Sequence, residues 1–323
     1  MDALSQLDLL DRRIMYELDL DARAPASSLA RKLRRSKETV NFRLNRLCEQ
    51  GFLKGFYTVF NTSKLGFYYY KFYIKFKNIT PKKEAELFEY VKRQPRIAYL
   101  ASTEGHYDAM ILVMVRTPKD VVAFWHPFMK KFGQFVQSNE STMFLTTRRF
   151  NNRFVHSGTE RRDWHYPLEV GAYSLDQVER KIVQALSDNA RMPLSEIAAR
   201  AGVDRTVAAY RLKKLEQDGI ILAFVTSPNF EKMGLEFFQI NISVRNPDKM
   251  RAMLDFFDNT NKCLFALEMV GRFDLAVELH LQNAEELKKV VDVFRENFSF
   301  DYNDYEVSTI TKEYKVVYCP FHW

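Results

Sequence analysis

The fold of this chain is decided by a stretch of sequence that occurs twice. "SKETVNFRLNRLCEQGFLKGFYTVFN" covers residues 36–61, and "DRTVAAYRLKKLEQDGIILAFVTSPN" covers residues 204–229. Between the two stretches the apolar letters are kept while the charged ones change. Pro25 matches Pro193 and Gly66 matches Gly234 at the same spacing, so the repeat continues on both sides without a gap. A period this long indicates two copies of a multi-element unit rather than a solenoid of short repeats.

Composition limits the classes of protein that this chain can belong to. The chain has 323 residues, of which 46% are hydrophobic and 28% charged, which is typical of a globular protein with several domains. Lys and Arg outnumber Asp and Glu by 48 to 41, and the net charge of +7 suits a polyanionic partner. Three widely spaced cysteines argue against a disulfide framework or a zinc ribbon. With no basic start for a signal peptide and no apolar run long enough to span a bilayer, we expect a soluble cytoplasmic protein without membrane contact.

The opening third of each copy predicts three short helices followed by a short β segment. Apolar residues recur at helical spacing in the first helix of each copy, and Pro25 and Pro193 mark the start of the second. Ser36 and Asp204 are good N-caps for a third helix that ends near Gly51 or Gly219. Two helices joined by a tight turn form a helix-turn-helix, and the β-prone residues 52–60 and 220–228 predict the hairpin of a winged helix.

The rest of each copy alternates strands and helices. In copy one we expect strands over 67–76, 97–102, 108–115 and 141–147, with helices over 82–93 and 119–132. "EGHYDAMILVMV" from Glu104 matches "VGRFDLAVELHL" from Val270, so copy two repeats the same βαββαβ order. This topology gives an antiparallel sheet with both helices on one face, and the other face is left to pair with a second sheet.

The chain is therefore predicted to be an α+β protein built from two tandem copies of a winged helix-turn-helix plus a ferredoxin-like βαββαβ domain. Winged helices are expected at 1–61 and 173–229, and βαββαβ domains at 66–150 and 234–318. Residues 151–172 are polar and non-periodic, which indicates a linker. The following arginines in and beside that linker either add phosphate contacts or, as is more common for basic linkers, are solvated: Arg148, Arg149, Arg153, Arg161 and Arg162.

The order of motifs resembles one family of regulators. "D-x-x-D/E-R-x-I", "P-x-S-x-L/I-A", "R-L-x-x-L-x-x-x-G" and "G-x-x-D" occur in this order in both copies. In this respect the chain resembles the Lrp/AsnC (leucine-responsive, or feast-famine) family of transcription regulators. The resemblance implies a sequence-specific DNA-binding regulator that responds to a small metabolite, often an amino acid. Members usually carry one copy and pair as dimers, so two copies in one chain imply a fused pseudo-dimer, with further homo-oligomers expected.

The third helix of each copy is the candidate DNA reader. Its N-terminal half should meet base edges in the major groove, while basic residues on its flanks should meet phosphates. In copy one Lys37, Glu38 and Asn41 are assigned to base reading, with Asn45 on the same outer face, and the phosphate contacts are Arg34, Arg35, Arg43 and Arg46. The matching face of copy two carries Arg205, Thr206, Ala209, Arg211, Lys213 and Lys214. A solvated basic face or a protein-binding winged helix is the alternative, and two such faces in a basic chain favour duplex DNA.

The later hairpin of each copy is the candidate effector site. A glycine and an aspartate between two strands most simply fix a turn. The family resemblance places a small-molecule effector near this hairpin, and by position it points to Gly105, His106, Tyr107 and Asp108 and to Gly271, Arg272, Phe273 and Asp274.

An enzyme on the same architecture is the alternative function. Siroheme decarboxylases share the two-domain arrangement, but the sequence shows no His-rich and Tyr/Arg-rich run of the kind that surrounds a tetrapyrrole. "CPFHW" at the end spaces Cys319 and His322 as half a metal site, without a second pair. The sequence also lacks a nucleophile motif, a phosphate loop and an HExxH. We therefore expect no catalytic residues, no metal and no cofactor.

Overall fold

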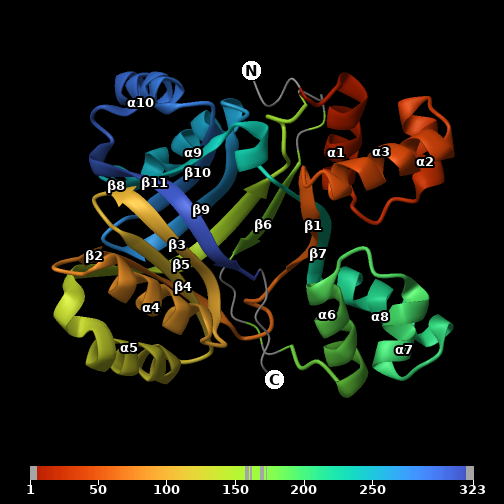
Figure 1. Ribbon diagram of the computed structural model, residues 1–323, viewed down its shortest axis with the longest axis horizontal. Helices are drawn as coiled ribbons and strands as arrows, with labels where there is room; N and C mark the ends of the chain where they lie inside the picture. Colours follow the sequence, from red (N-terminus) through yellow and green to blue (C-terminus); the bar gives the residue numbers. More distant parts are fainter. Residues whose placement is uncertain (1–5, 157–159, 161, 168–170, 172, 318–323) are drawn as a thin grey trace. The chain divides into compact units, whose positions relative to one another are not determined.

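The computed structural model describes residues 6–156, 160, 162–167, 171 and 173–317 (Figure 1). The chain divides into two compact units. The head unit comprises Met1–Asn61, Arg149–Trp164 and Tyr173–Glu236, and the sheet unit comprises Thr62–Arg148, His165–Ala172 and Phe237–Trp323. The units therefore group like with like: both winged helices belong to one and both βαββαβ copies to the other.

The head unit contains the two predicted helix-turn-helix copies. Copy one has α1 (Leu9–Leu20), α2 (Ala26–Leu33), α3 (Lys37–Glu49) and β1 (Leu53–Phe60). Copy two repeats them as α6 (Gln177–Asp188), α7 (Leu194–Ala201), α8 (Arg205–Gln217) and β7 (Ile221–Pro228). The predicted caps are present, because Ser36 accepts a hydrogen bond from the Thr39 amide and Asp204 accepts one from the Val207 amide.

The wing departs from the prediction. A hairpin within each copy was expected, but β1 pairs antiparallel with β7, its own counterpart, in a two-stranded sheet (Figure 1). The hairpin prediction is wrong because each copy supplies one short strand here, and the duplicate strand is the partner that satisfies its backbone groups. Consequently the two winged helices are joined through their strands.

A reciprocal pair of arginines strengthens this join. Arg23 Nη1 donates to the carbonyl oxygens of Ala190 (2.6 Å) and Met192 (3.1 Å), and Arg191 Nη1 donates to the carbonyl oxygen of Ala22. Each guanidinium thus binds the backbone of the other copy. The two helices predicted to read DNA, α3 and α8, lie in a single unit as a result.

The sheet unit confirms the βαββαβ order of both copies. Copy one runs β2 (Tyr68–Phe76), α4 (Pro81–Lys92), β3 (Ile97–Gly105), β4 (Ala109–Val115), α5 (Pro118–Phe132) and β5 (Val136–Phe150). Copy two runs β8 (Glu236–Val244), α9 (Met250–Asn259), β9 (Cys263–Gly271), β10 (Leu275–Leu281), α10 (Ala284–Phe298) and β11 (Tyr302–Val316). A short strand, β6 (Asp163–Pro167), borders β5.

The two βαββαβ copies pair within this chain, edge to edge. The strand order is β2-β4-β3-β11-β8-β10-β9-β5-β6, and β2 also pairs with β5, which closes the sheet on itself. The seams between copies are β3–β11 and β9–β5, with Gly105 opposite Ser308 in the first. The cluster of buried residues that holds Tyr73 and Tyr107 also holds Met269 and Phe273, so the inner faces of both copies share one core.

An arginine beside the predicted linker is a buried anchor of the head unit. The Arg149 side chain is 1% exposed; its Nη2 donates to Asp19 Oδ1 at 2.7 Å, and its Nε donates to the Tyr57 hydroxyl at 2.8 Å. Arg153 is also buried. The prediction of solvated or phosphate-binding arginines is therefore wrong at Arg149 and Arg153, because burial removes both from solvent, whereas Arg161 lies outside the described residues.

Candidate nucleic-acid interface

The outer faces of α3 and α8 carry the residues that the sequence assigned to base reading. Val40, Leu44 and Leu47 turn one side of α3 into the core, and Ala208, Leu212 and Leu215 do the same for α8. The following predicted residues are exposed: Lys37, Glu38, Asn41 and Asn45 on α3, with Arg34 and Arg35 before it, and Arg205, Thr206 and Lys213 on α8. Ala209 is half-buried. The helices thus present polar faces of different composition.

Each face also carries an exposed aromatic side chain that the sequence reading missed. Phe42 is 65% exposed, and its counterpart Tyr210 is 66% exposed. Phe42 lies four residues after Glu38 and three before Asn45, which places it in the middle of the outer face. A helical-wheel check would have found it, because Phe42 lies on the side opposite Val40, Leu44 and Leu47.

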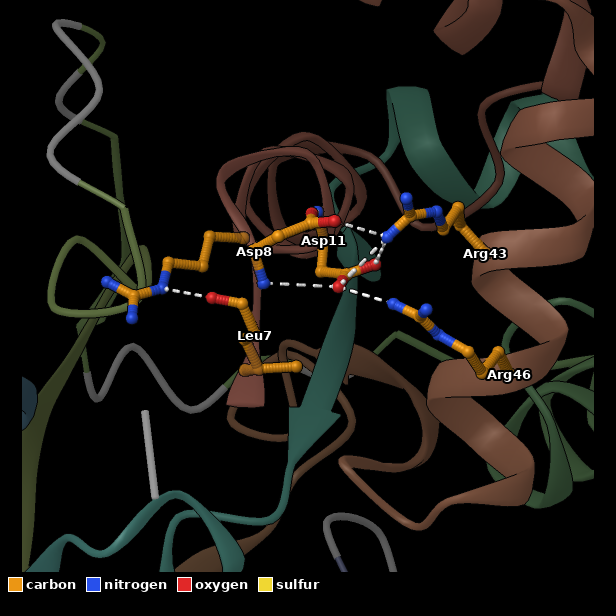
Figure 2. Close-up of polar contacts among 6 residues, drawn as sticks. Leu7, Asp8, Asp11, Arg43 and Arg46 are labelled. Carbon is orange, nitrogen blue, oxygen red and sulfur yellow. Dashed lines mark hydrogen bonds and ion pairs between the residues drawn. The ribbon is translucent and has the colours of Figure 1, made fainter. Parts of the chain in front are cut away.

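Two of the predicted phosphate contacts in copy one bind carboxylates of α1 (Figure 2). Arg43 Nη1 lies 2.5 Å from Asp8 Oδ2 and 3.2 Å from Asp11 Oδ1, and Arg46 Nη2 lies 2.5 Å from Asp11 Oδ2. The Asp11 side chain is fully buried. Asp8 is also the N-cap of α1, so these ion pairs fasten α3 to the first turn of α1.

The environment of Asp8 favours its charged form. Desolvation works to raise the pKa of this carboxyl, but the Asp11 amide and the Arg43 guanidinium outweigh it and hold the pKa below its usual value. Asp8 therefore stays ionised and keeps its bond to Arg43 at neutral pH.

Copy two repeats this tie with changed side chains. Arg211 Nη1 lies 2.9 Å from Asp176 Oδ2 and 3.2 Å from Glu179 Oε1, and Lys214 Nζ lies 3.4 Å from Glu179 Oε1. Asp176 and Glu179 stand where copy one has Asp8 and Asp11. The signal for the tie was present in the sequence, since "D-x-x-D/E" opens both copies. The assignment of Arg43, Arg46, Arg211 and Lys214 to phosphates stays a prediction.

The candidate effector hairpins lie on the seams between the copies of the sheet unit. A Cβ on Gly105 would lie 2.6 Å from the Val307 carbonyl oxygen, and one on Gly271 would lie 2.6 Å from the Ser141 carbonyl oxygen. Both glycines have positive φ, so each hairpin needs glycine to approach the opposite copy. Asp108 accepts from the Phe76 amide at 2.7 Å and Asp274 from the Val244 amide at 2.7 Å, so both aspartates brace their turns.

The remaining hairpin residues divide into buried and exposed. Tyr107 and Phe273 are buried in the shared core, and burial raises the pKa of the Tyr107 hydroxyl. His106 and Arg272 are exposed and converge on one carboxylate: Arg272 Nη2 lies 2.5 Å and His106 Nε2 4.0 Å from Glu306 Oε1. Sequence reasoning missed Glu306, whose contact with both hairpins arises only from the closed sheet.

Two classes of site are absent from the part of the chain that the structure describes. There, no group of three His, Cys, Asp or Glu residues is placed to hold a metal ion. Over the same residues, no helix is long and apolar enough to cross a membrane. Cys319 and His322 lie outside the described residues.

Comparison with known protein families agrees with the duplication of the helix-turn-helix. A family described as winged helix-turn-helix DNA-binding matches the chain twice, at residues 7–54 and 175–221. These matches cover the helices and the start of the strand in each copy, and α3 and α8 lie inside them.

Curated relatives of single-copy length are similar to part of the chain. An HTH-type transcriptional regulator of Pyrococcus abyssi is 30% identical over 126 residues, which span 38% of this chain and 84% of the relative. One from Pyrococcus horikoshii is 29% identical over 126 residues, with the same two coverages. A segment that is less than half of this chain therefore matches most of the length of such a regulator.

One solved structure is similar over nearly the whole chain. The siroheme decarboxylase NirDL superposes with a TM-score of 0.66, covering 95% of this chain and 93% of its own, at 14% sequence identity. At this identity the likeness shows the fold alone.

Proposed function

This chain belongs to the HTH-type transcriptional regulators. On that premise we propose that it is a tandem two-copy member of the Lrp/AsnC type, whose two predicted recognition helices read two unlike half-sites of one DNA operator. The chain is a sequence-specific DNA-binding transcription regulator. The observation that carries the proposal is the pairing of two diverged outer faces, those of α3 and α8, in one compact unit.

The chemistry of the two faces supports unequal half-sites. Asn41 can form two hydrogen bonds with adenine, whereas its counterpart Ala209 can at most touch a thymine methyl group. Glu38 accepts a hydrogen bond from cytosine, and Thr206 in its place is less selective. Phe42 and Tyr210 add apolar surface at the centre of each face, which suits a thymine methyl group. The preferred operator is an imperfect palindrome with half-sites one or more helical turns apart.

Selection from random duplexes tests the reading of half-sites. Asn41→Ala should cost about 1–3 kcal/mol on the half-site of copy one and relax the preference at one base pair there. Phe42→Ala should weaken binding by about 1 kcal/mol, since part of one aromatic side chain loses its burial. Val122→Ala, at an exposed apolar position of α5 in the sheet unit, is the matched control and should leave both results unchanged.

Two results would contradict this reading. Recovery of a perfect palindrome with the natural chain would show that the divergence between α3 and α8 carries no sequence information. An Asn41→Ala protein with unchanged preference at every position would remove Asn41 from base reading.

For the sheet unit we propose an amino-acid effector at the paired hairpins. Arg272 offers a guanidinium to a carboxylate, and Glu306 and Glu140, whose Oε1 lies 3.9 Å from Arg272, offer oxygens to an ammonium group. Calorimetry with single amino acids tests this site, and Arg272→Gln should abolish any heat signal while Arg251→Gln, on an exposed face of α9, should not. Equal binding by both variants would place the effector elsewhere.

We further propose that the chain has no enzymatic activity. In support, the curated relatives that the chain resembles are HTH-type transcriptional regulators, and the whole-chain likeness to a siroheme decarboxylase, at 14% identity, is one of fold alone. Titration with siroheme discriminates between the two readings. We expect no change in the absorbance of siroheme; a saturable spectral shift with one equivalent would favour the tetrapyrrole enzyme.

A further inference from the structure

The core shared by the two sheet copies contains a charged residue from each copy. Lys71 on β2 has a side chain that is 3% exposed, and Glu278 on β10 has one that is 17% exposed. Lys71 Nζ lies 3.7 Å from Glu278 Oε1 and also donates to Gln239 Oε1. This pair joins copy one to copy two in the interior.

The contacts around the pair link equivalent positions of the duplication. Gln239 is the counterpart of Lys71, and Asn241 is the counterpart of Tyr73, each 168 residues further on. The Tyr73 hydroxyl donates to Asn241 Oδ1 at 3.1 Å, and Gln239 Nε2 lies 3.0 Å from the Tyr73 hydroxyl oxygen. Residues related by the internal repeat thus meet each other across the core, as they would on the twofold axis of a dimer.

Copy one holds no counter-ion for its own lysine at this place. Directly opposite Lys71 on the neighbouring strand is Leu112, which is the counterpart of Glu278. If copy one paired with copy one of a second chain, Lys71 would face another Lys71, with Leu112 on both sides. If copy two paired with itself, two Glu278 carboxylates would be buried without a lysine. Both arrangements bury like charges without a partner, which is strongly unfavourable.

We propose that this polar cluster makes the pairing of the sheet copies heterotypic. With this cluster in the core, copy one pairs stably with copy two. Neither copy pairs stably with a second copy of itself. Pairing within one chain, which the structure shows, satisfies the cluster, and two chains do not associate through homotypic copies at this interface. The inference concerns assembly and is independent of the proposed DNA and effector sites.

Burial of the pair is consistent with a role in specificity rather than stability. Desolvation lowers the pKa of Lys71 and raises that of Glu278, against the attraction between them. Each charge is therefore costly alone, and a buried pair acts chiefly by penalising the wrong partner.

Disulfide trapping in the full chain distinguishes the two kinds of pairing. Ser102 Oγ lies 2.9 Å from Thr311 Oγ1 across the β3–β11 seam, so Ser102→Cys with Thr311→Cys reports heterotypic pairing as a bond within the chain. The counterpart of Thr311 in copy one is Leu145 on β5. Within one chain β3 pairs with β11 and β5 pairs with β9, so residues 102 and 145 of the same chain do not face each other. If copy one paired with copy one of a second chain, β3 would lie beside β5 of that chain. Ser102→Cys with Leu145→Cys therefore reports homotypic pairing as a disulfide bond between chains.

The natural core should give the first bond and not the second. The double variant Lys71→Gln with Glu278→Leu gives both copies the same neutral residues at these two positions. In this neutral core the yield of chains linked through residues 102 and 145 should rise by about tenfold or more. A tenfold rise corresponds to about 1.4 kcal/mol in pairing free energy. The chain without added cysteines controls for Cys48, which is exposed. Equal yields of linked chains from the natural and neutral cores would overturn the proposal.

A charge exchange keeps the proposal testable if the neutral core fails to fold. Lys71→Glu and Glu278→Lys alone each place like charges together, and each should lower the unfolding midpoint by about 5 °C or more. The double variant restores opposite charges and should recover at least half of that loss. Losses that simply add in the double variant would show that the two charges do not recognise each other.

Discussion

The two copies in the head unit share one frame and differ in what they attach to it. In both, a carboxylate in the first turn of the first helix, Asp11 or Glu179, binds two basic residues of the recognition helix. The outer faces have diverged instead, most clearly at Asn41 and Ala209. Positions that hold the helix in place have kept their charge, while outward positions have changed in side-chain chemistry, with Thr206 in place of Glu38 and Ala209 in place of Asn41. The contacts that support α3 and α8 are therefore more alike in the two copies than the outer faces of these helices are.

A second difference between the two copies is a buried ion pair that copy one has at the end of its first helix. Asp19 at the end of α1 is buried and binds Arg149, the Asn152 amide and the Thr226 hydroxyl. Its counterpart in copy two is Ser187, whose hydroxyl donates to the Val183 carbonyl within its own helix at 2.9 Å. Copy one is thus fastened by an ion pair to a distant segment of the chain, and copy two lacks that attachment at this position.

Breaking this attachment should have the largest effect. Arg149→Met leaves the Asp19 carboxylate buried without its cation and should destabilise the head unit by about 3–5 kcal/mol. Ser187→Ala removes one local hydrogen bond and should cost less than about 1 kcal/mol. Hydrogen exchange of α1 and α6 measures both in one chain. Combining Arg149→Met with Asp19→Ser, the residue of copy two, should recover at least half the loss; no recovery would mean that packing of Arg149, and not its charge, matters.

Breaking the ion pairs that join α1 to α3 and α6 to α8 should have the next largest effect on stability. Arg46→Gln removes one charged donor from the fully buried Asp11 and should cost about 1–3 kcal/mol, measured by denaturant unfolding. Lys214→Gln should cost less, because Lys214 Nζ is 3.4 Å from Glu179 and its side chain is 40% exposed.

The salt dependence of DNA binding tests whether Arg46 contacts a phosphate or only Asp11. If Arg46 is held by Asp11, Arg46→Gln should leave the slope of log affinity against log salt unchanged. Arg35→Gln, at an exposed position that the sequence assigns to the phosphate contacts, should reduce the slope by about 0.9. An equal reduction for Arg46→Gln would return that arginine to the phosphate contacts.

The smallest expected effect is the acid sensitivity of Asp8. Its pKa in the folded chain lies below the ordinary value of 3.8, so its ionisation stabilises the fold above that pH and the contribution is lost as pH falls through the folded pKa. Asp8→Asn keeps an N-cap and removes the charge. Because the Asp8 side chain is 51% exposed, the loss at neutral pH should stay below about 1 kcal/mol. Thermal unfolding of both proteins should differ at pH 7 and converge below about pH 3.

The sequence by itself determined the duplication and the order of elements. Helical spacing, the caps at Ser36 and Asp204 and the two βαββαβ patterns are local properties, and local propensity and periodicity encode them directly. The exposure of Lys37, Glu38 and Asn41 also follows from spacing, because buried Val40, Leu44 and Leu47 define the opposite side of α3. For the same reason the exposure of Phe42 was available to sequence reasoning and was overlooked.

Only the tertiary structure decided which partners meet across the repeat. A strand leaves its backbone groups open to any strand of suitable length, so nothing local distinguishes a hairpin from the β1–β7 pair. Likewise, a basic residue such as Arg149 reads as solvated until the fold places Asp19 and Tyr57 around it. The contacts of Lys71 with Gln239 and Glu278 and of Arg272 with Glu306 join positions far apart in the chain. Such pairs depend on the closure of the whole sheet, which is a long-range property that no window of sequence contains.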